Sequence, residues 1–176
     1  DVGRFKAKIE PLRKGYLVVG RQIPYKRVDL AIEACARLNV PLTVIGRGSE
    51  HHKLKAMAKD NVTFLTDVPD EELPFYYHRA RGLIFPAKED FGIVPVEAMA
   101  VGCPVIAYRE GGSLDYMNSK TGVLFKEQNA ESLVDAIKRF ENSNFKKRDL
   151  LNQANKFRPE AFRQKISNFV SKSFKN

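Results

Sequence analysis

Glu89 and Glu97 are separated by seven mostly apolar residues. Pro95, inside that stretch, fits best in the first turn of a helix, where its missing amide hydrogen is not needed. The pattern predicts a helix that begins near residues 93–94, with Glu89 in the preceding loop and Glu97 one turn inside. The two carboxylates would then lie on either side of a helix amino end, whose free amide groups attract an anion.

This arrangement suits a ligand with a phosphate centre and a polyol at each end. Gly92 would let such a ligand approach the backbone, and the carboxylates would accept hydrogen bonds from its hydroxyl groups. A nucleotide sugar has this layout. The alternative is that Glu97 only stabilises the helix amino end while Glu89 is solvated. The amide groups expected to meet the phosphates or the sugar are those of Phe91, Gly92, Ile93 and Val94.

Other candidate residues lie in two earlier loops. Gly20 ends a strand, and Arg21 and Lys26 follow it before a helix, where two cations would favour a diphosphate. The alternative is a pair of ordinary surface cations. Gly46 and Gly48 follow the next strand and would allow a close approach to a ligand, or simply a tight turn. Because this G-x-G lacks the third glycine of a dinucleotide fingerprint, the motif alone is weak.

The rest of the chain alternates short apolar runs with stretches of helical periodicity, which favours a parallel sheet covered on both faces. We predict an α/β fold with a doubly wound, Rossmann-like parallel sheet of about six strands, followed by C-terminal helices. Ligands of such sheets bind outside the carboxyl ends of the strands, so the candidate loops should share one rim. The expected strands are 16–20, 41–46, 61–66, 82–86, 104–108 and 122–125, and the expected helices are 26–39, 51–59, 70–80, 93–102, 113–118 and 130–142, with two more over 146–174.

Length and composition are those of one soluble globular domain over residues 1–176, with a helical tail over 146–176. The chain has 176 residues, of which 43% are hydrophobic and 29% charged. Cys35 and Cys103 lie far apart and are expected to be buried thiols in a reducing compartment. No apolar run approaches the roughly 18 residues that span a bilayer.

The formal net charge is +9, and the segment 138–175 is rich in Lys and Arg interleaved with Phe. The pattern is typical of amphipathic helices with solvated basic faces. Contact with a membrane surface or with a protein partner is the alternative. Nucleic acid is not expected as a partner, because the sequence has no aromatic platform or recognisable reading motif.

Six segments, in this order, resemble the C-terminal, donor-binding domain of the retaining family-4 glycosyltransferases, which have the GT-B fold. The resemblance covers about residues 16–140 and is closest to the mannosyltransferases. Its most specific part is the Glu-x7-Glu motif filled by Glu89 and Glu97. The segments are GRQIPYK, VIGRGSE, NVTFL, FPAKEDFGIVPVEAMAVGCPVIA, REGG and TGVLF.

The resemblance implies a role for each candidate residue. Arg21 and Lys26 would contact the donor diphosphate, Glu89 would hold hydroxyls of the transferred sugar, and Glu97 would bind the ribose. The rim that includes Gly46, Gly48 and residues 65–68 would frame the base. The implied reaction is glycosyl transfer with retention of configuration, in which the leaving phosphate takes the acceptor's proton, with no metal ion and no cofactor beyond the donor substrate.

The resemblance also implies partners. Family-4 enzymes have a second domain, before this one, that carries the acceptor site, and 176 residues leave no room for it. We therefore expect a donor-binding half with little transfer activity by itself, acting with a missing N-terminal domain on a glycan or lipid-linked acceptor. GDP-mannose is the favoured donor and a UDP-hexose the alternative. We expect a cytoplasmic location, with peripheral contact at the inner membrane face.

Two other functions stay open at this point. A non-catalytic nucleotide-binding or protein-interaction module would share the same sequence features without transfer activity. An enzyme of another class with this architecture, such as a sugar-nucleotide epimerase, is disfavoured because it would lack the Glu-x7-Glu context.

Overall fold

The computed structural model describes residues 13–173 and contains one six-stranded sheet in which all neighbouring strands run parallel. Its order is β3-β2-β1-β4-β5-β6. This is the order of a doubly wound Rossmann-like domain. The predicted fold class and all six predicted strands are confirmed, as β1 (Tyr16–Val19), β2 (Leu42–Ile45), β3 (Val62–Leu65), β4 (Gly82–Phe85), β5 (Val105–Tyr108) and β6 (Gly122–Phe125).

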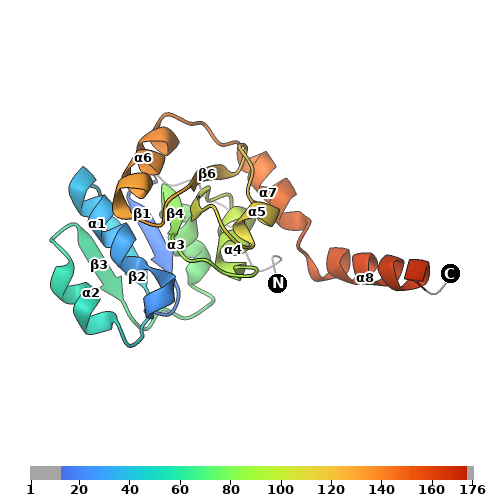
Figure 1. Cartoon of the computed structure of the whole chain (residues 1–176), viewed down its shortest axis with the longest axis horizontal. Coiled ribbons are helices and arrows are strands. Elements are labelled where there is room, and N and C mark those ends of the chain that lie inside the picture. The colour runs from blue at the N-terminus through green and yellow to red at the C-terminus, as the bar shows by residue number, and fades with distance from the viewer. Residues whose placement is uncertain (1–12, 174–176) are drawn as a thin grey trace.

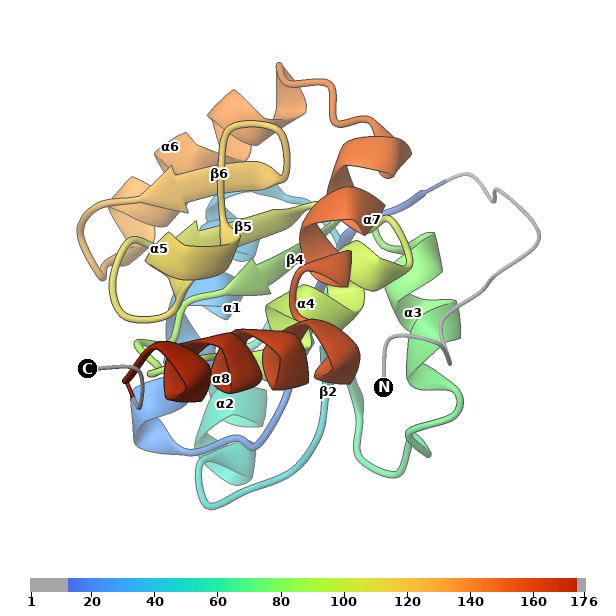
Figure 2. The same cartoon turned by 90° about the vertical axis from the view of Figure 1, so that its right-hand side faces the viewer.

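Helices cover both faces of the sheet (Figures 1 and 2). One face packs against α1, α2 and α6, and the other packs against α3, α4 and α7. The helices are α1 (Val28–Leu38), α2 (His51–Met57), α3 (Leu73–Arg79), α4 (Ile93–Ala100), α5 (Ser113–Tyr116), α6 (Ala130–Glu141), α7 (Lys147–Asn155) and α8 (Pro159–Ser173), with a 3-10 turn, η2 (Pro24–Lys26), before α1.

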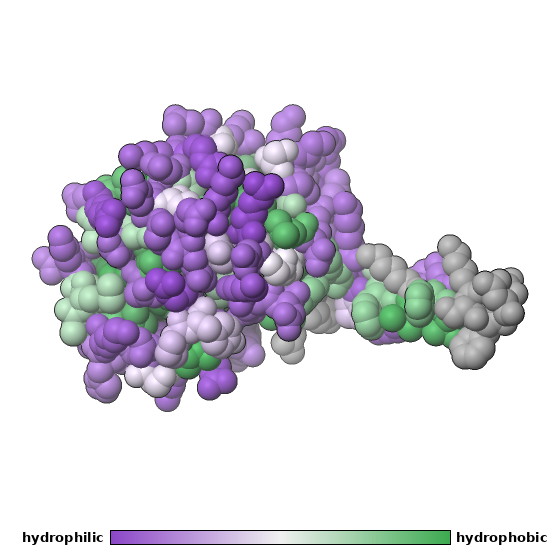
Figure 3. Space-filling model, in the orientation of Figure 1, coloured by the Kyte–Doolittle hydropathy of each residue, from purple (hydrophilic) through white to green (hydrophobic). Residues whose placement is uncertain are grey.

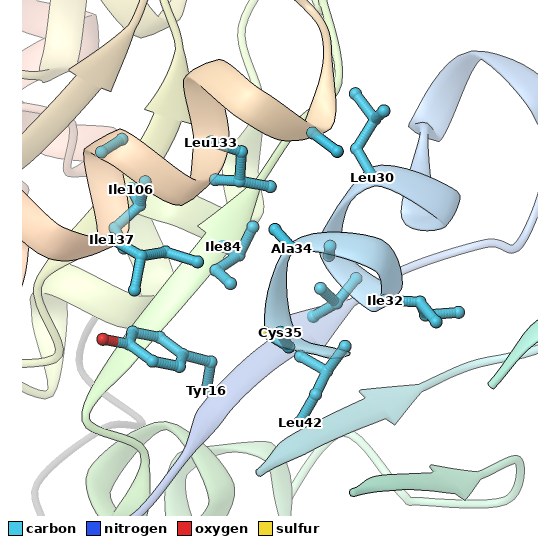
Figure 4. Close-up of a cluster of buried hydrophobic side chains, with 14 of the residues drawn as sticks. Tyr16, Leu30, Ile32, Ala34, Cys35, Leu42, Ile84, Ile106, Leu133 and Ile137 are labelled. Atoms are coloured by element: carbon cyan, nitrogen blue, oxygen red, sulfur yellow. The ribbon is translucent and has the colours of Figure 1, made fainter. Parts of the chain in front are cut away.

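Burial of the strands on both faces explains their continuous apolar sequences. In β1, Tyr16 and Val18 belong to the cluster under α1 and α6, while Leu17 belongs to the cluster under α4. Figure 4 shows the first of these clusters, in which Ile84 and Ile106 meet side chains of α1 and α6. Cys35 and Cys103 are buried free thiols, as predicted.

Two local details differ from the sequence prediction. The helix expected over 70–80 begins only at Leu73, and its N-cap is Glu72 without a side-chain cap. Asp70 therefore does not start this helix. The segment expected to lead straight into the helix at 26–39 instead forms η2, and Arg27, with φ of 50°, separates η2 from α1.

The tail forms the two predicted helices, and the second, α8, begins at Pro159. Helix α7 packs against α4, whereas α8 extends away from the sheet (Figure 1). Apolar side chains gather along this extension (Figure 3). Those that are exposed on α8 are Phe162, Ile166, Phe169 and Val170. The last residues of the tail, 174–176, and the first twelve of the chain lie outside the described residues.

Candidate functional site

The loops that follow β1 and β4 are brought side by side by the sheet order. After β1 the chain adds β2 and β3 on one side, and then crosses to add β4 on the other. In open α/β sheets, ligands bind at this reversal, outside the carboxyl ends of the two strands. Residues 20–27 and 86–92 form the two loops at that position. They contain Arg21, Lys26 and Glu89.

Lys26 and Glu89 form an ion pair across these two loops. Their side chains are only 18% and 19% exposed, so the pair is largely withdrawn from water. The Lys26 ammonium also lies over the ring of Phe85, the last residue of β4, with Nζ 5.9 Å from the ring centroid. Two residues that the sequence placed in one site are thus in direct contact.

Arg21 adds a second positive charge to this place. Burial lowers the pKa of the Lys26 ammonium, and the nearby charge of Arg21 lowers that pKa further. Two neighbouring cations, with Glu89 as the paired carboxylate, make a site where further negative charge is stabilised. Arg21 itself is exposed on the rim.

The amino end of α4 lies beside this pair in the sequence and has no side-chain cap. The helix begins at Ile93, as predicted, and Pro95 is in its first turn. Phe91 and Ile93 are 45% and 57% exposed. The first amide groups of a helix lack intrahelical partners, and the N-cap of α4 supplies no side-chain acceptor for them.

Gly92 is the N-cap of α4, with φ of 76°. A side chain at this position would meet the protein itself, because a Cβ would lie 2.9 Å from the Tyr116 hydroxyl oxygen and 3.1 Å from the Phe85 ring. The requirement for glycine is therefore explained by internal packing and by backbone conformation. A ligand contact at the backbone of Gly92 stays a prediction.

Glu97 lies on the other side of α4, against α3. The Tyr77 hydroxyl donates a hydrogen bond to Glu97 Oε2 at 3.2 Å. Burial raises the pKa of the Glu97 carboxyl, the hydrogen bond from Tyr77 opposes this rise, and the charge of Asp70 adds to it. Tyr77 was not singled out from the sequence, where it looks like one of several apolar residues of its helix.

The glycines of the first two loops have different surroundings. A Cβ on Gly46 would collide with the carbonyl of Gly20, and one on Gly48 would collide with the carbonyl of Gln22. These two glycines therefore let the second loop pack on the first. Gly20, with φ of 141°, faces open space. It is the glycine of these loops at which a ligand could approach the backbone.

Gln22 connects the two loops and was missed from the sequence. Its side chain is fully buried. Gln22 Nε2 donates a hydrogen bond to the Gly46 carbonyl at 2.5 Å, and Gln22 Oε1 lies 2.7 Å from His51 Nδ1. Its position between Arg21 and Lys26, in a loop of otherwise charged and apolar residues, was the only signal that the sequence offered. Among residues 13–173, no three His, Cys, Asp or Glu side chains gather as metal ligands would.

The open, doubly wound parallel sheet with charged loops at its reversal defines a Rossmann-type α/β domain. The chain belongs to the glycosyl transferases group 1 family, whose model matches residues 3–158. It thus belongs to the GT-B class that the sequence motifs resemble.

Two named relatives illustrate the membership. The human alpha-1,3/1,6-mannosyltransferase ALG2 is 29% identical over 89% of this chain and 44% of its own length. The O-antigen chain mannosyltransferase RfbU of Salmonella typhimurium is 35% identical over 72% of this chain and 41% of its own length. The chain therefore spans less than half the length of these relatives.

Solved structures agree on the fold. Sucrose-phosphate synthase from Thermosynechococcus elongatus superposes with a TM-score of 0.80 at 26% identity, covering 93% of this chain and 46% of the other. Alr3699/HepE from Anabaena, solved with UDP and glucose, has a TM-score of 0.80 at 20% identity, and the match covers 97% of this chain and 54% of the Anabaena chain.

Proposed function

We propose that this chain is the donor-binding domain of a retaining hexosyltransferase that takes its sugar from a nucleoside diphosphate. The observation that carries this proposal is the Lys26–Glu89 ion pair at the reversal point of the sheet, beside Arg21 and the uncapped amino end of α4. The family membership supplies the class of reaction, and the pair supplies a place for the diphosphate and the sugar.

Donor binding would rearrange the ion pair. A diphosphate carries more negative charge than one carboxylate, so Lys26 and Arg21 would turn to it. Glu89 would then be free to accept hydrogen bonds from hydroxyls of the sugar. The donor would thus replace the Lys26–Glu89 contact with contacts of its own.

The chemical step breaks the bond between the anomeric carbon and the diphosphate oxygen, and forms a bond from that carbon to the acceptor oxygen on the same face. The acceptor's proton passes to the departing phosphate. Lys26, Arg21 and the α4 amide groups stabilise the charge that grows on the leaving group. Glu97, on the α3 side, would bind the ribose. Gly46, Gly48 and residues 65–68 would border the base.

GDP-mannose is the favoured donor, with mannose as the transferred sugar. Several relatives are named mannosyltransferases, and a relative from Mycolicibacterium smegmatis, 31% identical over 68% of this chain and 36% of its own length, is named GDP-mannose-dependent. A UDP-hexose is the alternative, because the border expected around the base consists mostly of backbone and loop.

The acceptor, a glycan or a lipid-linked glycan, would bind to a second domain. We propose that the exposed apolar face of α8 packs against that domain. Among residues 13–173, no helix is both long enough and apolar enough to cross a bilayer. Peripheral contact with the cytoplasmic membrane face is the competing use of α8. Co-purification of the separately expressed upstream domain would support the first use, and flotation of the chain with anionic vesicles would support the second.

Calorimetric titration with GDP, UDP and ADP and their sugar derivatives tests the donor site. Lys26→Met should weaken every nucleoside diphosphate by about 1.5–3 kcal/mol, the value of a hydrogen bond to a charged group. The matched control is Lys138→Met on α6, where the lysine is 61% exposed. Equal affinities in the two variants would remove the diphosphate assignment.

A non-catalytic nucleotide-binding module remains the alternative function. It shares the donor site and differs only in the absence of transfer. Joining this chain to its upstream domain and assaying transfer of radiolabelled sugar separates the two. Transfer that Glu89→Gln slows supports the enzyme, and tight donor binding without transfer supports the module.

A further inference from the structure

Three aromatic rings from distant parts of the chain meet behind the loop that carries Glu89. Phe91 comes from that loop, Tyr116 from the end of α5, and Phe157 from the junction between α7 and α8. The ring centroids of Phe91 and Phe157 are 5.7 Å apart, those of Phe91 and Tyr116 are 6.3 Å apart, and those of Tyr116 and Phe157 are 6.4 Å apart. These separations are typical of favourable aromatic packing.

The backbone of the same loop is supported from a second side. The Gly112 amide donates to the Glu89 carbonyl at 2.8 Å, and Glu89 pairs with Gly111 in an isolated parallel bridge. A Cβ on Gly112 would lie 2.5 Å from the Phe91 carbonyl oxygen, so the two loops are in close backbone contact. The two glycines at 111 and 112 therefore allow the neighbouring loop to pack closely.

Tyr116 is the most deeply buried of the three aromatic residues. Its side chain is fully buried, and within residues 13–173 its hydroxyl has no hydrogen-bond partner. The Phe91 ring, by contrast, belongs to a residue that is 45% exposed. Phe91 is thus held only in part by the body of the domain, and Phe157 supplies the contact from the tail side.

We propose that Phe157 is a positioning residue for Glu89. Its ring holds Phe91 and so fixes the loop from which Glu89 reaches the sugar, an inference that rests on the proposed donor site. Because α8 begins at Pro159, only two residues later, a partner that shifts α8 also shifts this contact. A shift of α8 would therefore change the position of the Glu89 carboxylate.

Amide hydrogen exchange in the ligand-free chain tests the coupling without any donor. In Phe157→Ala, the Gly112 amide should exchange roughly two- to twelvefold faster, the change expected from the loss of an aromatic pair. The Leu83 amide, which donates to Pro104 in the central sheet, should stay within twofold of wild type, about the scatter of such comparisons. The matched control is Phe162→Ala on α8, where the ring is 64% exposed. Unchanged exchange at Gly112, or an equal rise at Leu83, overturns the proposal.

Binding provides the second readout. Phe157→Ala should weaken GDP-mannose or UDP-glucose relative to the corresponding free diphosphate, and Phe157→Tyr should restore the wild-type ratio. Equal weakening of sugar-bearing and sugar-free ligands would overturn the positioning of Glu89. A wild-type chain that binds none of these ligands would overturn the donor site instead, while exchange at Gly112 decides the ring coupling separately.

Discussion

Glu89 and Glu97 are the same residue type, one before the amino end of α4 and one within its second turn, yet their environments differ. Glu89 lies in a loop and is held by a charged partner, Lys26. Glu97 lies within α4 and is held by a neutral donor, the Tyr77 hydroxyl. Burial raises the pKa of the Glu97 carboxyl, and the hydrogen bond from Tyr77 opposes this rise without cancelling it.

The two partners, Lys26 for Glu89 and Tyr77 for Glu97, indicate which of the two contacts a bound ligand could replace. In the proposed donor site, a diphosphate would replace Glu89 as the partner of Lys26 and Arg21, and the Glu89 carboxylate would then turn to the sugar. A carboxylate that accepts a hydrogen bond from a tyrosine hydroxyl has further lone pairs, so Glu97 could accept a hydrogen bond from a ribose hydroxyl and keep the one from Tyr77. Under this proposal, Glu89 is a mobile acceptor, which changes its partner when the donor binds, and Glu97 is a fixed acceptor, which keeps its partner.

The largest expected effect comes from disturbing the turn between the two glutamates. Gly92→Ala places a Cβ against the Tyr116 hydroxyl at a backbone φ of 76°. Left-handed strain and overpacking each cost about 1–3 kcal/mol, so we expect a loss of about 2–6 kcal/mol in the free energy of unfolding. Urea denaturation measures this loss.

Tyr116→Phe supplies the matched background for that measurement, because it removes the atom nearest to the new methyl group. In this background the cost of Gly92→Ala should be smaller. An identical cost in both backgrounds would show that the hydroxyl contact contributes nothing and that backbone strain alone explains the glycine.

The fixed acceptor should matter for every nucleotide. Glu97→Ala should weaken GDP, UDP and their sugars alike by about 1–3 kcal/mol, because ribose hydroxyls lose their acceptor. Titration calorimetry measures the loss, with Glu160→Ala on α8, whose side chain is 72% exposed, as the control. Unchanged affinities in the Glu97 variant would remove the ribose assignment.

The mobile acceptor should matter only when a sugar is present. Glu89→Gln should weaken GDP-mannose or a UDP-hexose by about 0.5–1.5 kcal/mol, the usual value of a hydrogen bond. The sugar-free diphosphates should lose nothing, since the variant also removes the carboxylate that competes for Lys26. Equal losses with and without the sugar would contradict the separate roles of the two glutamates.

The smallest effect is a pH dependence of stability. Because the folded protein raises the pKa of Glu97, the stability contributed by this carboxyl is present at low pH and is lost as the pH rises through that pKa. Glu97→Gln removes the loss. The stability of the variant relative to wild type should therefore increase between about pH 4 and about pH 7, as measured by urea denaturation across the range in which glutamate titrates. A constant difference would indicate that Glu97 is not buried enough to matter.

The fold could be predicted from the sequence because its signals are local. Six apolar strand segments, each bounded by Gly, Pro or polar residues, alternate with helical patterns, and the position of Pro95 located the start of α4. The start of α3 was predicted less well. Asp70 looked like a cap, but the helix begins at Leu73, since Pro74 fits its first turn.

The internal contacts of the candidate site could not be predicted, because they depend on how separate loops meet. No spacing in the sequence shows that Lys26 reaches Glu89, or that Gln22 is buried between two loops. Gly46, Gly48 and Gly92 were expected to admit a ligand, with a tight turn as the alternative for the first two. A Cβ at each position would meet a neighbouring part of the chain, so internal packing explains the glycines, and ligand contact there stays a prediction. Gly20 alone among these four positions faces open space.

The most direct test of the donor site is a titration of the isotope-labelled chain with GDP-mannose, and in parallel with UDP-glucose, followed by amide chemical shifts. We predict that one of them moves the signals of residues 20–26 and 89–97 together, with a single dissociation constant, while those of α8 stay in place. Shifts confined to other surfaces, or no shifts with either donor, would contradict a donor site built on Lys26 and Glu89.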